Sequence, residues 1–130
     1  MSSHLVLQKI MASDYPLVIR DIAANLLGGY KTVGAVLEGL TNGQLEELIR
    51  YAVDIHMGDC GAALDNYVLL AGMLAQAEGL DHNIDPAIHV SNLLILVSFE
   101  KMYRNDLIFF DRRKATLAPE LNTAKIAVLK

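Results

Sequence analysis

The stretch Asp85–Arg104, with the sequence DPAIHVSNLLILVSFEKMYR, limits the possible folds of this chain more than any other stretch. Asp85 is a favourable N-cap residue and Pro86 a favourable first helical residue, so the start of a helix is well marked. Five apolar residues then follow without a break at positions 93–97. A helix that is apolar nearly all round is usually buried. We therefore expect Pro86–Arg104 to be the central buried helix of a compact all-α bundle of about five helices.

Four further helices are expected before this central helix, because apolar residues recur there at helical spacing. Thr41 and Gln44 match a capping box and mark the start of the third of them. The last is rich in small residues on one side, so we expect it to pack on the central helix. Ser3–Ala12 fits either a short helix or an extended arm. The four expected helices are Tyr15–Leu27, Lys31–Gly39, Thr41–Met57 and Cys60–Glu78.

The chain after Arg104 leaves two interpretations open. Apolar residues continue at a spacing of three and four, so the central helix could extend to about Lys114. Alternatively, the segment DLIFF at 106–110 forms a strand. Leu121–Leu129 has too little pattern to distinguish an arm from a short helix. We treat residues 107–130 as a possible oligomerisation arm of a single helical domain that spans residues 1–130.

The length and the cysteine usage limit the class of protein. A chain of 130 residues can bury a sufficient core without a metal or a disulfide. Cys60 is the only cysteine, which favours a reducing compartment. No stretch reaches the roughly 18 apolar residues of a membrane span, and the first residues lack the features of a secretory signal. We therefore expect a soluble, cytoplasmic protein.

Charge is distributed unevenly along the chain. Residues 1–100 hold four Lys and Arg residues against twelve acids, whereas residues 101–130 hold seven against three. Such an acidic body with a basic C-terminal arm indicates either docking of the arm on an acidic face or the binding of an anion. We favour docking or simple helix-end charges, because both are common roles for such residues. The candidate anion-binding residues are Lys101, Arg104, Arg112, Arg113 and Lys114.

Histidine and cysteine provide the ligand types for a metal or thiol site, at His56, Cys60, His82 and His89. Their spacing matches none of the standard zinc patterns. Asp59 also opposes the formation of a thiolate at Cys60. Packing and helix ends account for these residues better than a metal or thiol site does, so we assign no metal ligand, no cofactor and no catalytic residue.

Several functional classes are disfavoured by the sequence. It has no serine-nucleophile motif, no paired-carboxylate motif and no glycine-rich phosphate loop, which argues against an enzyme. A helix-turn-helix near residues 35–50 would present Glu46 and Glu47 to DNA phosphates, which would repel them. DNA is therefore not an expected partner, and neither is a membrane.

The apolar content favours association. Hydrophobic residues make up 53% of the chain, more than one small core readily hides. We expect a non-enzymatic protein–protein interaction factor, such as an adaptor, inhibitor or small chaperone-like protein, which forms a homo-oligomer, most simply a dimer, through Leu107, Phe109 and Phe110. One alternative is a protein that holds a nucleotide or another phosphate-bearing anion through the basic residues. The least supported alternative is a metal- or thiol-dependent enzyme that uses His56 and Cys60.

Overall fold

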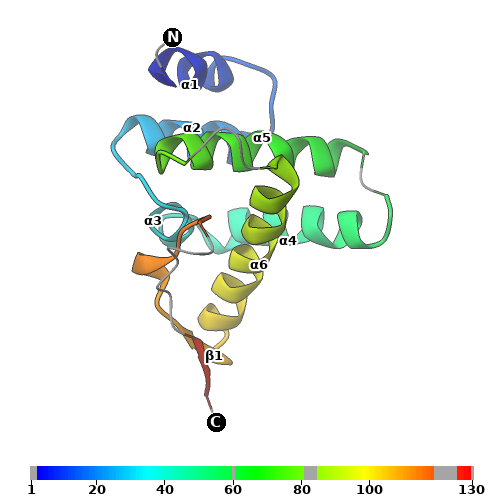
Figure 1. The fold of residues 1–130 in the computed structure, drawn as a ribbon. Helices are drawn as coiled ribbons and strands as arrows, with labels where there is room; N and C mark the ends of the chain where they lie inside the picture. The colour runs from blue at the N-terminus through cyan, green and yellow to red at the C-terminus, as the bar shows by residue number, and fades with distance from the viewer. Residues whose placement is uncertain (1–2, 60, 81–84, 119–125, 130) are drawn as a thin grey trace.

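The computed structural model describes residues 3–59, 61–80, 85–118 and 126–129, and the statements below refer to these residues. Six α-helices precede a small sheet of two antiparallel strands (Figure 1). The predicted all-α class is confirmed. The segment Ser3–Ala12, for which both a short helix and an extended arm were possible, contains a helix. The elements are α1 (Ser3–Met11), α2 (Leu17–Leu27), α3 (Val33–Glu38), α4 (Asn42–His56), α5 (Gly61–Ala77), α6 (Pro86–Arg104), β1 (Ile108–Phe110), the 3-10 turn η1 (Arg112–Lys114) and β2 (Ile126–Val128).

The helices are stacked so that α1 and β2 lie at opposite ends of the molecule (Figure 1). α1 lies on α2, and α2 contacts α5. α5 in turn contacts α4 and α6, as predicted for the pair α5 and α6. α6 runs from the α5 level down to the sheet, where β1 contacts it. The core therefore lies between α2, α4, α5 and α6, and residues of α1, α3 and β1 contribute to it.

Local capping signals explain the start of two helices. At α4, the Gln44 N–H donates to Thr41 Oγ1 (3.1 Å) and the Thr41 N–H donates to Gln44 Oε1 (3.0 Å), so the predicted capping box is confirmed. At α6, the Ala87 N–H donates to Asp85 Oδ1 (3.0 Å), and Pro86 is the first helical residue. The bounds of α6 are those that we predicted.

The core consists mainly of aliphatic side chains, with Tyr67 as its largest buried member. The Tyr67 hydroxyl donates to the Leu48 carbonyl oxygen (2.8 Å), which satisfies the hydroxyl and joins α5 to α4. Burial raises the pKa of Tyr67 well above its ordinary value. None of the described helices combines the length and the apolar character needed to cross a bilayer.

α6 is the central helix of the bundle, as predicted, but its outer side is exposed. Leu93, Leu96 and Val97 are buried, but Ile88 and Ile95 are 45% and 48% exposed. The reason is geometric, because five consecutive residues span more than one full turn of a helix. The neighbouring helices cover only the inner side of α6.

The expectation that α6 could continue to about Lys114 is wrong. The helix ends at Arg104, and Asp106 then adopts a left-handed backbone with φ 58°. The alternative prediction of a strand is confirmed, because β1 pairs with β2 with Phe109 opposite Ala127. Residues 126–128 are therefore a strand and not a short helix, whereas residues 121–125 lie outside the described part of the chain.

Candidate functional site

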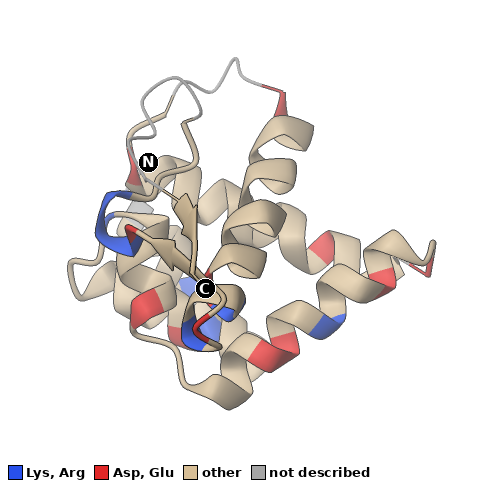
Figure 2. Ribbon diagram, turned by 90° about the horizontal axis from the view of Figure 1, so that it is seen from below, with Lys and Arg blue, Asp and Glu red and all other residues tan. Residues whose placement is uncertain are grey.

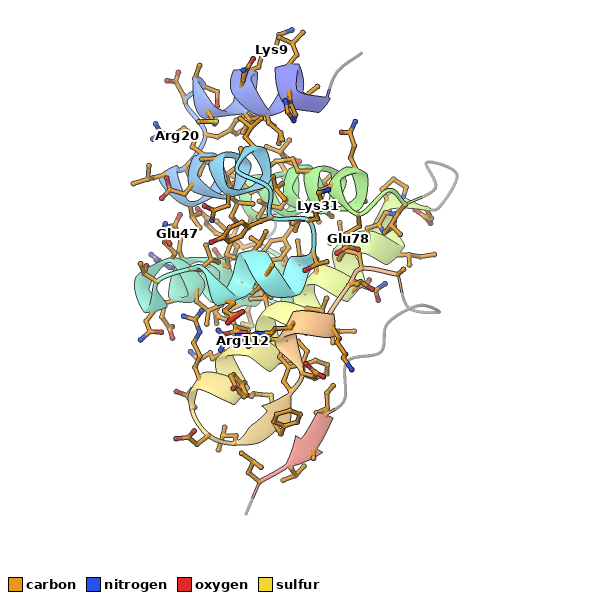
Figure 3. All side chains as sticks on the ribbon, turned by 90° about the vertical axis from the view of Figure 1, so that its left-hand side faces the viewer. Lys9, Arg20, Lys31, Glu47, Glu78 and Arg112 are labelled. Atoms are coloured by element: carbon orange, nitrogen blue, oxygen red, sulfur yellow. The ribbon has the colours of Figure 1, made fainter. Side chains whose placement is uncertain are left out.

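Glu100 is fully buried on the inner side of α6. Its Oε2 atom lies 2.6 Å from Arg104 Nε and 2.8 Å from Arg112 Nη2. A carboxylate is tolerated in a protein interior only when it is paired in this way. Figure 3 shows Arg112 between the helices and the small sheet. Glu100 therefore joins α6 to the segment that follows β1.

Arg104 and Arg112 make further contacts around Glu100. Arg104 Nη1 donates to Asn42 Oδ1 (2.9 Å), and Arg104 Nη2 donates to the Leu37 carbonyl oxygen (2.7 Å). The Arg112 guanidinium lies over the Tyr103 ring at 5.0 Å from its centroid, a cation–π contact. The two arginines therefore connect α3, α4, α6 and η1.

The other basic residues of the predicted anion site lie apart from this cluster. Lys101 forms an exposed ion pair with Glu46 (2.9 Å). Arg113 and Lys114 face solvent. Arg113 lies 3.8 Å from a carboxylate oxygen of Glu38, and Lys114 lies 4.0 Å from one of Asp111. Figure 2 shows the blue residues of η1 at the edge of the molecule, while the acids are spread over several helices. The five predicted residues do not converge on one empty site.

Glu78, at the end of α5, is a second acid with a structural contact. Its Oε2 accepts the Val33 N–H (3.0 Å) and its Oε1 accepts the Leu117 N–H (2.9 Å). Burial raises the pKa of Glu78, and these two hydrogen bonds oppose the rise. Glu78, labelled in Figure 3, thus holds the segment after η1 against the start of α3.

Gly34 lies directly against the backbone of η1. A Cβ at this position would be 1.4 Å from the Arg112 carbonyl oxygen, so no larger residue fits there. The Gly34 N–H also donates to the Ala115 carbonyl oxygen (3.2 Å). Residues 111–118 are therefore packed against the body of their own chain.

The three predicted interface residues differ in exposure. Leu107 and Phe109 are 53% and 45% exposed, whereas Phe110 is buried. The Phe110 ring lies 5.6 Å from the ring of Phe99 on α6. Phe110 therefore belongs to the core of its own chain, and Leu107 and Phe109 are the two that remain on the surface.

Strand β2 is uncovered on both faces. Ile126 and Val128 are opposite the buried residues Phe110 and Ile108, yet Val128 is 74% exposed. The Leu129 N–H donates to the Leu107 carbonyl oxygen (3.1 Å). Because hydrogen-bonded and non-hydrogen-bonded pairs alternate, the backbone groups of Ile126 and Val128 point away from β1. Within the described part of the chain, β2 pairs with β1 alone, so its other edge is open and carries apolar side chains.

An apolar groove lies at the opposite end, between α1, α5 and the start of α6. Its volume is about 460 Å³. Gly72 contributes an open part of its wall, since nothing lies within 4 Å of a Cβ built there. Gln76 and His89 are its polar members. The apolar lining includes Val6, Ile10, Val68, Met73, Leu80 and Pro86.

The described residues include no group of three or more His, Cys, Asp or Glu side chains that could hold a metal ion. His56, Ser91 and Ser98 are among the residues that line a hollow of about 450 Å³ between α4 and α6. His89 lies instead in the apolar groove. Cys60 and His82 are outside the described residues.

Comparison of the chain with family models, with curated proteins and with solved structures gives no match. A functional assignment therefore depends on the surfaces themselves. Neither Glu78 nor Glu100 nor the apolar groove was predicted from the sequence. Helical spacing could have indicated that Glu100 is buried, because it lies one turn after Leu96 on the buried side of α6.

Proposed function

We propose that this protein is a non-enzymatic protein–protein interaction factor, such as an adaptor, inhibitor or small chaperone-like protein, that acts as a homodimer. The observation that carries the proposal is the open edge of β2, where Val128 is 74% exposed. An exposed strand edge with apolar side chains is a template for pairing with another chain. A cytoplasmic location is part of the proposal, because a single cysteine can form no internal disulfide.

The backbone of β2 is suited to antiparallel pairing with its own copy. A two-fold axis at Ala127 places Ile126 of one chain opposite Val128 of the other. These are the residues whose N–H and C=O groups point away from β1, so each such pair would exchange two hydrogen bonds. The result is a four-stranded sheet with an isologous interface.

The side chains favour the same arrangement. An isolated two-stranded sheet is marginally stable, and additional strands stabilise it. Pairing would bring Ile126 and Val128 of both chains together on the face that carries Ile108 and Phe110. On the outer face, the two Ala127 residues would lie opposite each other at the centre of the sheet, with an exposed Phe109 on the strand beyond each.

Native mass spectrometry of a proline variant, which lacks one backbone N–H on the open edge of β2, tests the proposal. In Val128→Pro, the lost N–H is the one that points away from β1, so the contact between β1 and β2 is retained. We expect the wild-type protein to have the mass of a dimer and the proline variant that of a monomer. A Val128→Lys variant should act in the same direction, because lysine on an edge strand opposes pairing.

Met57→Lys is the matched control. Met57 is 79% exposed at the end of α4, so the substitution adds the same charge at a similarly exposed apolar residue elsewhere. This variant should remain dimeric. A wild-type protein with the mass of a monomer, or a dimer that survives Val128→Pro, would contradict pairing through β2.

Anion binding remains the second candidate, and one observation favours it. Arg104 and Arg112 share a single carboxylate, so their cluster has a surplus positive charge, and Arg113 and Lys114 are exposed nearby. Because Arg112 is paired with Glu100, the test uses the double variant Arg113→Ser, Lys114→Ser. Pyrophosphate should bind the wild type and not this variant, as measured by calorimetry. Equal heats from both proteins would exclude these two residues as the site.

A further inference from the structure

The apolar groove between α1, α5 and α6 has the size of a binding site for a small molecule. Its volume of about 460 Å³ lies within the range of roughly 300–1,000 Å³ that is usual for such sites. Val6 and Val68 on its walls are partly exposed, so the groove is accessible from solvent. It lies far from β2, at the end of the molecule formed by α1 (Figure 1).

His89 adds an observation that points to a ligand. Its side chain lines the groove and is 6% exposed. Its Nδ1 atom has no hydrogen-bond partner among the described residues. A buried polar atom without a partner is energetically costly, so native structures rarely retain one unless a ligand or water completes it. The groove thus combines an apolar wall with one unsatisfied polar atom.

The residues that line the groove also restrict the charge of its occupant. The described lining contains no Lys, Arg, Asp or Glu side chain. A charged head group would therefore enter an apolar site without a counter-ion, which is strongly unfavourable. A neutral hydroxyl or carbonyl group can satisfy one ring nitrogen at much lower cost.

We infer that this groove is a binding site for an uncharged, largely apolar small molecule whose single hydroxyl or carbonyl group hydrogen-bonds to His89. The apolar part of the molecule lies against α1 and α5, where Val6, Val68 and Met73 line the groove. This site is independent of the dimer contact proposed for β2.

The first experiment measures binding of the uncharged fluorescent probe N-phenyl-1-naphthylamine, with 1-octanol as a competitor. In Gly72→Leu, the new side chain grows from the groove wall into open space. Leucine is a better helix former than glycine, so the fold should persist. We expect the wild type to bind the probe saturably with one site per chain, and Gly72→Leu to bind it about tenfold or more weakly.

Gly61→Leu is the matched control, because Gly61 is also exposed in open space on α5 but is not part of the groove. This variant should bind the probe as the wild type does. Equal binding by wild type and Gly72→Leu would overturn the proposal. So would a change in oligomer mass in Gly72→Leu, since the groove would then be a contact between copies of the chain.

The second experiment tests the role of His89. His89→Leu keeps an apolar side chain at the groove and removes the hydrogen bond. We expect 1-octanol to compete about fivefold less well in this variant, which corresponds to one hydrogen bond, while 1-chlorooctane competes equally in both proteins. An unchanged affinity for 1-octanol would show that His89 does not bind the head group and would overturn the assignment.

Discussion

Glu100 is bound by Arg112, a residue on the far side of strand β1, with 2.8 Å between Glu100 Oε2 and Arg112 Nη2. The carboxylate has no exposed surface, and the same oxygen also accepts from Arg104. Part of the positive charge of the C-terminal region therefore neutralises a buried acid of the same chain.

Glu100→Ala should destabilise the protein strongly. The variant leaves two largely buried guanidinium groups without their shared acceptor, and breaking a buried pair costs about 3–5 kcal/mol. Urea denaturation measures the free energy of unfolding. Glu46→Ala, which breaks the exposed pair with Lys101, is the control and should change it by less than about 1 kcal/mol. Similar losses of the free energy of unfolding in both variants would mean that the buried ion pairs of Glu100 contribute no more to stability than the exposed pair does.

Gly34→Ala should force α3 away from η1. The added Cβ meets the Arg112 carbonyl oxygen, a backbone atom, and the hydrogen bond from Gly34 to Ala115 is lost as the two segments separate. We expect a loss of about 2 kcal/mol or more in thermal or urea unfolding. Gly43→Ala is the control, because the nearest atom to its Cβ is 3.9 Å away. A native stability for Gly34→Ala would contradict this close approach.

Phe110 and Phe109 should behave differently although they are adjacent. Phe110→Ala removes a buried ring that packs on Phe99, and such truncations cost about 3–5 kcal/mol. Phe109→Ala truncates a half-exposed ring and loses its edge contact with the Tyr103 ring, so we expect a smaller loss, of about 1 kcal/mol. Unfolding curves should be measured at one fixed protein concentration, since dimer formation also contributes to stability. Equal losses would place both rings in the core.

Glu78 should make stability depend on pH in a defined direction. Because burial raises the pKa of Glu78 above its ordinary value of 4.5, the folded protein holds this proton more tightly than the unfolded chain does. The free energy of unfolding of the wild type, relative to Glu78→Gln, is therefore greatest below about pH 4.5. It falls as the pH rises through the raised pKa.

Urea unfolding of both proteins between about pH 4 and pH 8 measures this difference. The glutamine variant lacks one of the two acceptors used by Val33 and Leu117, which lowers its stability at every pH, so the slope is the informative quantity. A difference that grows with pH would show that the hydrogen bonds outweigh burial at Glu78.

The helices were predictable because their signals are local. Asp85 and Pro86 fix the start of α6, and the capping box at Thr41 fixes the start of α4, within a few residues each. The segment after Arg104 was ambiguous, because a short apolar run fits both a helix and a strand. Asp106 decides between them through its left-handed backbone, which spacing does not reveal.

The candidate sites were harder to predict, because they depend on contacts between distant segments. Arg112 was assigned to a possible anion site from charge alone, although its partner Glu100 lies on another element. Phe110 was assigned to an interface, since no pattern in β1 shows which face packs on α6. The groove around His89 needs α1, α5 and α6 in place, so no local sequence motif encodes it.

The contact between Gly34 and the backbone of Arg112 also determines when the fold can be completed. A growing chain emerges with α1 to α6 first, whereas Glu100 receives its second guanidinium, and Glu78 its Leu117 partner, only from residues made later. The helices can collapse early, with Glu100 paired to Arg104 and Glu78 to the Val33 N–H, but each acid lacks one of its partners until that later segment arrives. Residues 112–117 therefore complete the packing of the helices, and a chain that stopped after Arg104 would lack these contacts.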